Sequence, residues 1–251
     1  MFASAFRFST ATGLILCAAT FFAAAVPAAG PGPAPAPGTY RTDGGWGRLE
    51  IRESAPAALH FDLRAEGPNG HSCALAGEIV AGVVRLSPRD GRDVCEVSFR
   101  AADDRIDVTT NGAASCRDHC GARAAFEGRY VRRAASCSES RRRQARKEFR
   151  RDYDAGRHAA AAGRLQPLLD ECAAALPWHE AGWIRNDLAL ARLKAGDPAA
   201  CLKTLEPLQA DAARTEADIR RDLPPSDASR LLSIVRATRT NQALCTARAP
   251  R

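Results

Sequence analysis

The sequence lacks the short motifs by which several large enzyme classes are identified. It has no phosphate-binding loop, no HExxH zinc motif, no GxSxG nucleophile motif and no dinucleotide-binding fingerprint. Apart from residues 13–26, no stretch approaches the roughly 18 uninterrupted apolar residues of a membrane-spanning helix. Lysine is scarce, since only Lys147, Lys194 and Lys203 occur. These absences exclude the motif-bearing enzyme families and a helical membrane protein. An active site assembled from distant residues needs no local motif and is not excluded.

The composition is that of a folded protein with an uneven charge. The chain has 251 residues, of which 45% are hydrophobic and 26% charged, so it can bury a core as one large or two small domains. The formal net charge is +7. Residues 38–134 hold 14 basic and 14 acidic side chains, whereas residues 135–251 hold 21 basic and 15 acidic ones. The positive charge therefore belongs to the second half of the chain.

The N-terminus predicts export. Arg7 precedes an apolar run over 13–26, and small residues follow it, which is the layout of a secretory signal peptide over residues 1–29. Cys17 has no small residue directly before it, so we interpret it as part of the signal peptide and not as a lipidation site. Residues 30–37 alternate Pro with Gly and Ala and predict a semi-rigid tether. The expected location is periplasmic or secreted.

Eight cysteines remain after the signal peptide, and an even number in an exported chain favours disulfides over free thiols. His119 between Cys116 and Cys120 could belong to a Cys/His metal site, but the paired spacing typical of zinc sites is missing. A catalytic cysteine would need an unpaired thiol, which the even count disfavours. We therefore expect no metal, no cofactor and no catalytic residue.

Residues 38–134 predict a β module. Apolar residues alternate with charged ones, as in Leu49 and Ile51, and turn signals separate about seven short strands. This pattern is typical of a small antiparallel barrel or sandwich. Cys73 and Cys95 share the parity of the inward-facing residues, so we predict a Cys73–Cys95 disulfide. The short loop between Cys116 and Cys120 predicts a second one, Cys116–Cys120.

Residues 135–251 predict a helical module, because alternation is absent and Ala, Leu and Arg dominate. The pattern of residues 155–168 recurs 40 residues later, with Gly at each turn, which is typical of stacked helical hairpins. Cysteines at matching distances from two hairpin turns predict the disulfides Cys137–Cys172 and Cys201–Cys245. The expected helices lie near residues 138–154, 157–176, 180–195, 198–222 and 226–247. The fold class is thus α+β in two modules.

Two segments resemble known families. Residues 182–208 resemble a tetratricopeptide repeat, with Ala189, Gly196, Leu205 and Leu208 at its small, turn and apolar positions, although the offset of 40 exceeds the usual 34 and Cys201 replaces an Ala. Residues 116–130, together with residues 69–73, resemble exported bacterial proteins that join such a β module to a helical one. Some of those proteins are labelled as similar to periplasmic lysozyme inhibitors. The resemblance implies a binding protein without catalysis.

Two groups of helical residues are candidates for binding. The first predicted helix carries seven basic residues and one acid over 141–151, beside a narrow apolar stripe. This face could contact an acidic partner, an anionic polymer or a membrane surface, or be merely solvated. The third and fifth helices carry polar residues that either line a peptide groove or hydrogen-bond neighbouring helices. The candidates are Arg141, Arg142, Arg143, Arg146 and Arg150, then Arg185, Asn186 and Asp187, and then Arg236, Arg239 and Asn241.

The sequence as a whole predicts an exported, disulfide-stabilised, non-enzymatic binding protein of the bacterial envelope. Its partner would be an envelope protein or peptide. A lysozyme-like enzyme is one candidate, but lysozymes are basic, so the positive charge favours an acidic partner. Nucleic acid is not expected outside the cytoplasm, and a membrane surface is the weaker alternative. The alternative functions are a structural scaffold within an envelope complex and an enzyme acting on cell-wall material.

Overall fold

The computed structural model describes residues 33–56, 58–87, 91 and 93–249. All of these belong to one compact unit, Pro31–Arg251. The predicted signal peptide, residues 1–29, lies outside the described residues. Residues 33–37 of the predicted tether form neither helix nor strand, yet Pro35 is buried, and the Tyr40 hydroxyl donates to the Ala36 carbonyl at 2.8 Å. The end of the tether therefore contacts the first strand.

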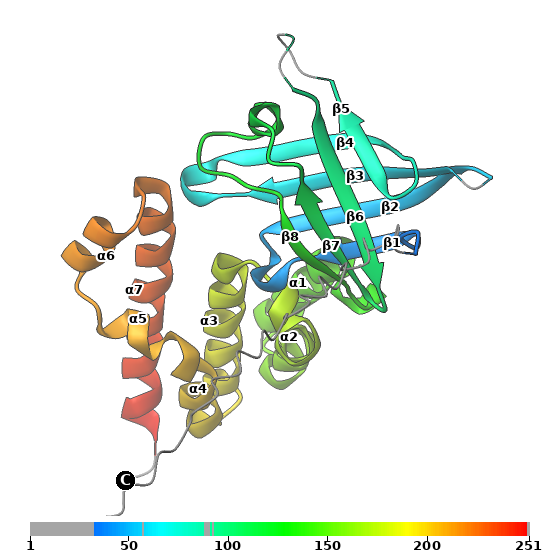
Figure 1. The fold of residues 1–251 in the computed structure, drawn as a ribbon. Coiled ribbons are helices and arrows are strands. Elements are labelled where there is room, and N and C mark those ends of the chain that lie inside the picture. The colour runs from blue at the N-terminus through cyan, green and yellow to red at the C-terminus, as the bar shows by residue number, and fades with distance from the viewer. Residues whose placement is uncertain (1–32, 57, 88–90, 92, 250–251) are drawn as a thin grey trace, which may run out of the picture. The chain divides into compact units, whose positions relative to one another are not determined.

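The first half of the described chain forms one antiparallel sheet of eight strands (Figure 1). The strand order across the sheet is β4-β3-β2-β1-β8-β7-β6-β5. Neighbouring strands are mostly consecutive in sequence, and the pairing of β1 with β8 joins the two ends of the module. The strands are β1 (Gly38–Arg41), β2 (Gly47–Ala55), β3 (Ala58–Glu66), β4 (Ser72–Ile79), β5 (Val83–Leu86), β6 (Cys95–Ala102), β7 (Arg105–Thr110) and β8 (Gly128–Arg132).

The sheet curls into a near-barrel around an apolar core. Its edge strands β4 and β5 meet at a two-residue turn, where Val80 and Val83 exchange backbone hydrogen bonds of 3.0 Å. The predicted alternation is confirmed, because inward-facing residues such as Leu49, Phe61 and Val97 are fully buried. The Phe61 and Phe99 rings lie 4.9 Å apart in this core. The antiparallel β architecture predicted from the sequence is therefore present.

Both disulfides predicted for the β module are wrong. The structure joins Cys73 to Cys120, with Cα atoms 4.0 Å apart, and Cys95 to Cys116, with Cα atoms 5.0 Å apart. Cys73 lies on edge strand β4 and Cys95 on β6, next to the other edge, so shared parity does not bring the two together. Cys116 lies within the 3-10 helix η3 (Ala114–His119) and Cys120 directly follows that helix, and each is bonded to a different strand.

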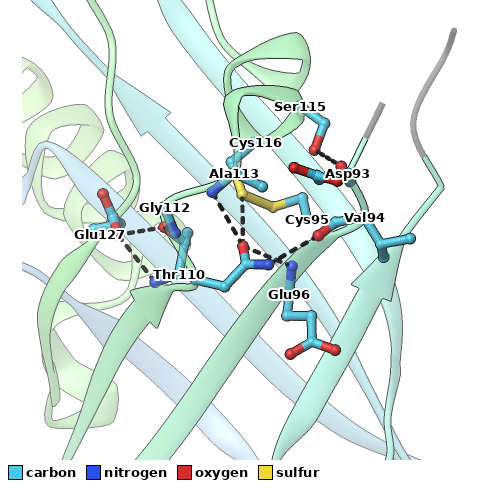
Figure 2. Close-up of a disulfide and its surroundings, with 11 residues drawn as sticks. Asp93, Val94, Cys95, Glu96, Thr110, Gly112, Ala113, Ser115, Cys116 and Glu127 are labelled. Carbon is cyan, nitrogen blue, oxygen red and sulfur yellow. Dashed lines mark hydrogen bonds between the residues drawn. A yellow bond between two sulfur atoms is a disulfide. The ribbon is translucent and has the colours of Figure 1, made fainter. Parts of the chain in front are cut away.

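Polar contacts hold the segment that carries Cys116 against the start of β6 (Figure 2). The Asn111 side-chain amide donates to the Val94 carbonyl at 2.9 Å, and its oxygen accepts from the backbone N–H of Glu96 at 3.2 Å. The Ser115 hydroxyl donates to the Asp93 carbonyl. These bonds fix the chain on both sides of the Cys95–Cys116 bridge, so this bridge joins segments that are already aligned.

The second half of the described chain is helical, as predicted. The two disulfides predicted from hairpin spacing are present, with Cα–Cα distances of 5.4 Å for Cys137–Cys172 and 6.1 Å for Cys201–Cys245. Among the described residues, no helix is long and apolar enough to cross a membrane. The helices are α1 (Glu139–Asp154), α2 (His158–Cys172), α3 (Trp178–Lys194), α4 (Pro198–Leu205), α5 (Gln209–Ala213), α6 (Glu216–Asp222) and α7 (Pro225–Arg248).

The predicted single helix over 198–222 is wrong, because this stretch consists of the separate helices α4, α5 and α6. Pro207 has no backbone N–H to donate, and a short 3-10 helix replaces the α-helix around it. Arg214 is extended, and the Thr215 hydroxyl accepts from the Asp218 N–H at 3.1 Å as the N-cap of α6. A proline and a capping threonine thus divide the segment.

The apolar stripe of α1 is buried at Phe149, against α2 and α3.

Two backbone contacts join the β module to the helical module within this compact unit. The 3-10 helix η1 (Asp43–Gly45) packs against η5 (Ala173–Ala175), just before α3. A Cβ on Gly45 would collide with the Ala175 carbonyl oxygen and lie 2.8 Å from the Pro177 nitrogen. At the second contact, the Asn69 N–H donates to the Asp227 carboxylate at 2.9 Å, and the Asn69 side-chain oxygen accepts from the Ser226 N–H. The junction therefore needs glycine at residue 45.

The disulfide connectivity is directly testable by a non-reducing tryptic map, because cleavage after Arg117 separates Cys116 from Cys120. We expect peptide 118–123 linked to peptide 65–85, and peptide 106–117 linked to peptide 93–100, each pair separating on reduction. Recovery of peptide 65–85 linked to peptide 93–100 would restore the Cys73–Cys95 alternative.

The close packing at Gly45 predicts that an added methyl group lowers the stability more at this glycine than at an unpacked one. Gly45→Ala should lower the free energy of unfolding by about 3 kcal/mol, because it combines an unfavourable positive φ with a backbone collision. Gly70→Ala is the matched control: Gly70 also has a positive φ, but no atom lies within 4 Å of the position that an added methyl would take, so about 1 kcal/mol is expected. Urea titration of both variants measures the difference. Equal losses would mean that the contact at Gly45 contributes little.

Candidate functional site

A row of arginines crosses three neighbouring strands beside the junction. Arg41 at the end of β1 lies directly opposite Arg48 of β2, and Arg48 lies directly opposite Arg64 of β3. Directly opposite residues point to the same face of a sheet, and like charges in that position repel each other. The register of the sheet therefore concentrates positive charge at one place.

Helix α1 adds three more arginines to the same place. Arg142, Arg143 and Arg146 line a cleft of about 380 Å³ together with the three strand arginines. The acidic residues in this lining are Glu66, Glu139 and Glu180, so six arginines and three carboxylates line the cleft. We call this site the arginine cleft and define it by these residues: Arg41, Arg48, Arg64, Arg142, Arg143 and Arg146.

Most cations of the arginine cleft already have an acidic partner. Arg48 binds Glu50 at 2.7 Å, Arg64 lies 3.4 Å from Asp62, and Arg146 lies 3.2 Å from Asp187. Arg142 pairs with Glu180 and Arg143 with Glu139. These pairs fix the positions of the guanidinium groups.

Arg41 is the exception. It is only 7% exposed, and within the described part of the chain its side chain has no hydrogen bond and no ion pair. Burial lowers the pKa of its guanidinium, and the nearby charges of Arg142 and Arg48 lower that pKa further, against the opposing charges of Glu139 and Glu180. The Nε of Arg142 is also buried without a hydrogen-bond partner. The Arg41 side chain and the Arg142 Nε thus have no hydrogen-bond acceptor among the described residues, and an anion entering the cleft would supply one.

A second hollow of about 370 Å³ adjoins the arginine cleft and shares Arg41, Arg48 and Glu139 with it. Arg133 and Arg141 extend the positive lining there, although Arg133 is paired with Asp43 at 2.7 Å. The predicted candidates on α1 therefore divide: Arg141, Arg142, Arg143 and Arg146 line this connected basic region. Arg150 lines neither hollow.

The candidates on α3 and α7 form helix-packing contacts. Asn186 is buried, and its amide donates to the Gly182 carbonyl and to the Thr238 hydroxyl, both at 3.0 Å. The Asn241 amide donates to the Asn186 side-chain oxygen at 3.0 Å. Arg239 donates to the carbonyls of Ala212 and Arg214, which holds the loop before α6. These contacts favour the structural alternative over a peptide groove.

The remaining candidates on α3 and α7, which are Arg185, Asp187 and Arg236, do not belong to the asparagine network. Arg236 makes two bonds to the Glu216 carboxylate, at 2.8 and 2.7 Å, on the exposed side of α7. Burial raises the pKa of Asp187, and the charges of Arg146 and Arg150 oppose that rise. Burial lowers the pKa of Arg185. Only Asp187 is tied to the arginine cleft, through Arg146.

The cysteines that entered the alternative metal interpretation all form disulfides, including Cys116 and Cys120 on either side of His119. Within the described ranges, no group of three or more His, Cys, Asp or Glu side chains has the arrangement of a metal site.

Comparison with known proteins gives no further assignment: no protein-family model, curated protein or solved structure matches this chain. The resemblances to a tetratricopeptide repeat and to lysozyme-inhibitor-like proteins therefore stay predictions.

The asparagine network predicts a large effect of one small truncation. Asn186→Ala should cost about 2–3 kcal/mol of stability, because it removes three buried hydrogen bonds, one of which is donated by the Asn241 amide. Arg236→Ala on the exposed face should cost much less, since water screens the pair with Glu216. Thermal unfolding followed by circular dichroism compares the two. An unchanged melting temperature for Asn186→Ala would contradict the structural assignment.

Proposed function

We propose that this protein is an exported, disulfide-stabilised binding protein without catalytic activity, and that its arginine cleft holds an acidic segment of an envelope protein or peptide. The observation that carries the proposal is Arg41, a buried cation without a hydrogen bond or ion pair among the described residues, in a cleft lined by five further arginines. A ligand carboxylate would supply the missing contacts of a side chain that is largely shielded from water.

Export is supported by two features. The N-terminal residues have the composition of a signal peptide, and the four disulfides are compatible with an oxidising compartment. The location in the periplasm or outside the cell is part of the proposal. So is a tetratricopeptide-like arrangement of the helical hairpins, for which the recurrence at 40 residues is the support.

The charge of the cleft also ranks the candidate partners. A basic, lysozyme-like target would be repelled by the net positive charge of the chain, whereas a run of Asp or Glu side chains would be attracted and steered. The structural-scaffold alternative predicts association through a largely apolar surface, which salt would leave intact. Salt dependence therefore separates the two functions.

Arg41→Met tests the proposal with hexaglutamate as the probe, measured by isothermal titration calorimetry on the mature chain. We expect binding by the wild-type protein to weaken as salt rises and to weaken at least about tenfold in the variant. Stability should stay equal or increase, because the substitution removes an unpaired buried charge. Loss of binding without loss of stability would identify Arg41 as a ligand-binding residue.

Arg100→Met is the matched control, since Arg100 is an exposed arginine of β6 outside the cleft and undergoes the same change of charge. It should bind hexaglutamate as the wild-type protein does. Equal binding by wild-type and Arg41→Met protein, or salt-independent binding, would contradict the proposal.

A further inference from the structure

A separate pocket lies at the same junction but has a different chemistry. It has a volume of about 420 Å³ and lies between η1, the turn after β3 and the first residues of α3 and α7. It shares Trp46, Glu66 and Pro177 with the arginine cleft, and none of the six cleft arginines lines it. This volume is within the range of small-molecule sites, about 300–1,000 Å³.

Two exposed indole rings line the pocket. Trp46 is 37% exposed and Trp178 is 46% exposed, and they are two of the three tryptophans of the protein. The Trp46 ring is held edge-on against the ring of Tyr130, with centroids 6.2 Å apart, and the Trp178 ring packs edge-on against His179 at 5.5 Å. Both indoles thus have supported positions and still present surface to a ligand.

The charges that line the pocket cancel. Glu66 and Asp227 supply two carboxylates, and Arg123 and Arg230 supply two guanidinium groups. Among the described residues, the side chains of Glu66, Arg123 and Arg230 form no hydrogen bond or ion pair, while one oxygen of Asp227 accepts from the Asn69 N–H. The pocket therefore offers unused donors and acceptors without an excess of either charge.

His179 adds a neutral donor and acceptor to this set. Burial lowers the pKa of its imidazole, and the charge of Arg230 lowers it further, against the opposing charges of Glu66, Glu180 and Asp227. At neutral pH the ring is uncharged, so it leaves the balance of two anions and two cations unchanged.

We infer that this pocket binds a pyranose ring of an oligosaccharide. A sugar ring has apolar C–H faces that stack on indoles and a rim of hydroxyl groups that both donate and accept hydrogen bonds, which matches two tryptophans among unpaired carboxylates and guanidiniums. The cancelling charges of the lining favour neither a cationic nor an anionic ligand. An anionic ligand would find more arginines in the neighbouring arginine cleft than in this pocket. The inference goes beyond the proposed function and does not depend on it.

The test measures the binding of two neutral probes, cellotriose and tri-N-acetylchitotriose, to the mature protein by titration calorimetry and tryptophan fluorescence. We expect saturable binding of at least one probe, weakened about tenfold in Trp178→Ala through loss of the stacking surface. Trp183→Ala is the matched control, because Trp183 lies on the same helix, is 37% exposed and does not line the pocket. It should bind like the wild-type protein.

A second variant keeps the test independent of folding. Arg230→Gln changes an exposed side chain with no partner among the described residues, and it should weaken sugar binding at least about threefold while leaving hexaglutamate binding unchanged. Failure of both trisaccharides to bind the wild-type protein would overturn the inference, as would equal effects of Trp178→Ala and Trp183→Ala. Because hexaglutamate is measured in parallel, failure at this pocket is distinguishable from failure at the arginine cleft.

Discussion

The close approach of two backbones at Gly45 is the constraint on which the rest of the structure depends. The η1 segment of the β module lies against the carbonyl of Ala175 with no room for a side chain. This contact places Trp46, Glu66 and Pro177 where they form the shared wall of two hollows. Neither hollow belongs to one module alone. A ligand bound in either one would contact both modules and so reinforce the junction.

Charge distribution gives the two hollows different chemistry. On one side, the sheet register aligns Arg41, Arg48 and Arg64, and α1 adds its own arginines, and each of these arginines except Arg41 is paired with a carboxylate. A folded protein that keeps Arg41 buried and unpaired gives up stability there. Such a cost is expected where a residue serves binding. On the other side, balanced charges and two indoles form a neutral pocket.

Local sequence patterns predicted the strands and most of the helices. Distances along the chain predicted two of the four disulfides. Alternation identified the buried faces of the strands, and matched spacing from two turns identified Cys137–Cys172 and Cys201–Cys245. Sheet order was not readable, because parity tells which face a cysteine is on and not which strand lies beside it. The Cys73 and Cys95 pairing failed for that reason.

Because the sequence does not show which strands are neighbours, it also did not identify Arg41 as a residue of the cleft. The basic face of α1 was visible in the sequence, and four of its arginines line the connected basic region. Arg41 was not found, because it becomes significant only through its position opposite Arg48 and its burial in the folded chain. The register of β1 against β2 is the information that would have placed Arg41 beside Arg48. Asn186 and Asn241 were seen as polar residues in helices, and only the packing of α3 on α7 shows that they bind each other.

The central claim is that one cooperative unit forms a cleft that holds acidic groups at the junction of its two modules. Differential scanning calorimetry of the wild-type protein, with and without hexaglutamate, tests it most directly. The account predicts a single unfolding transition whose midpoint rises with peptide concentration, because a ligand that binds only the native state stabilises it. Two independent transitions, or a single one that hexaglutamate does not move, would contradict the account.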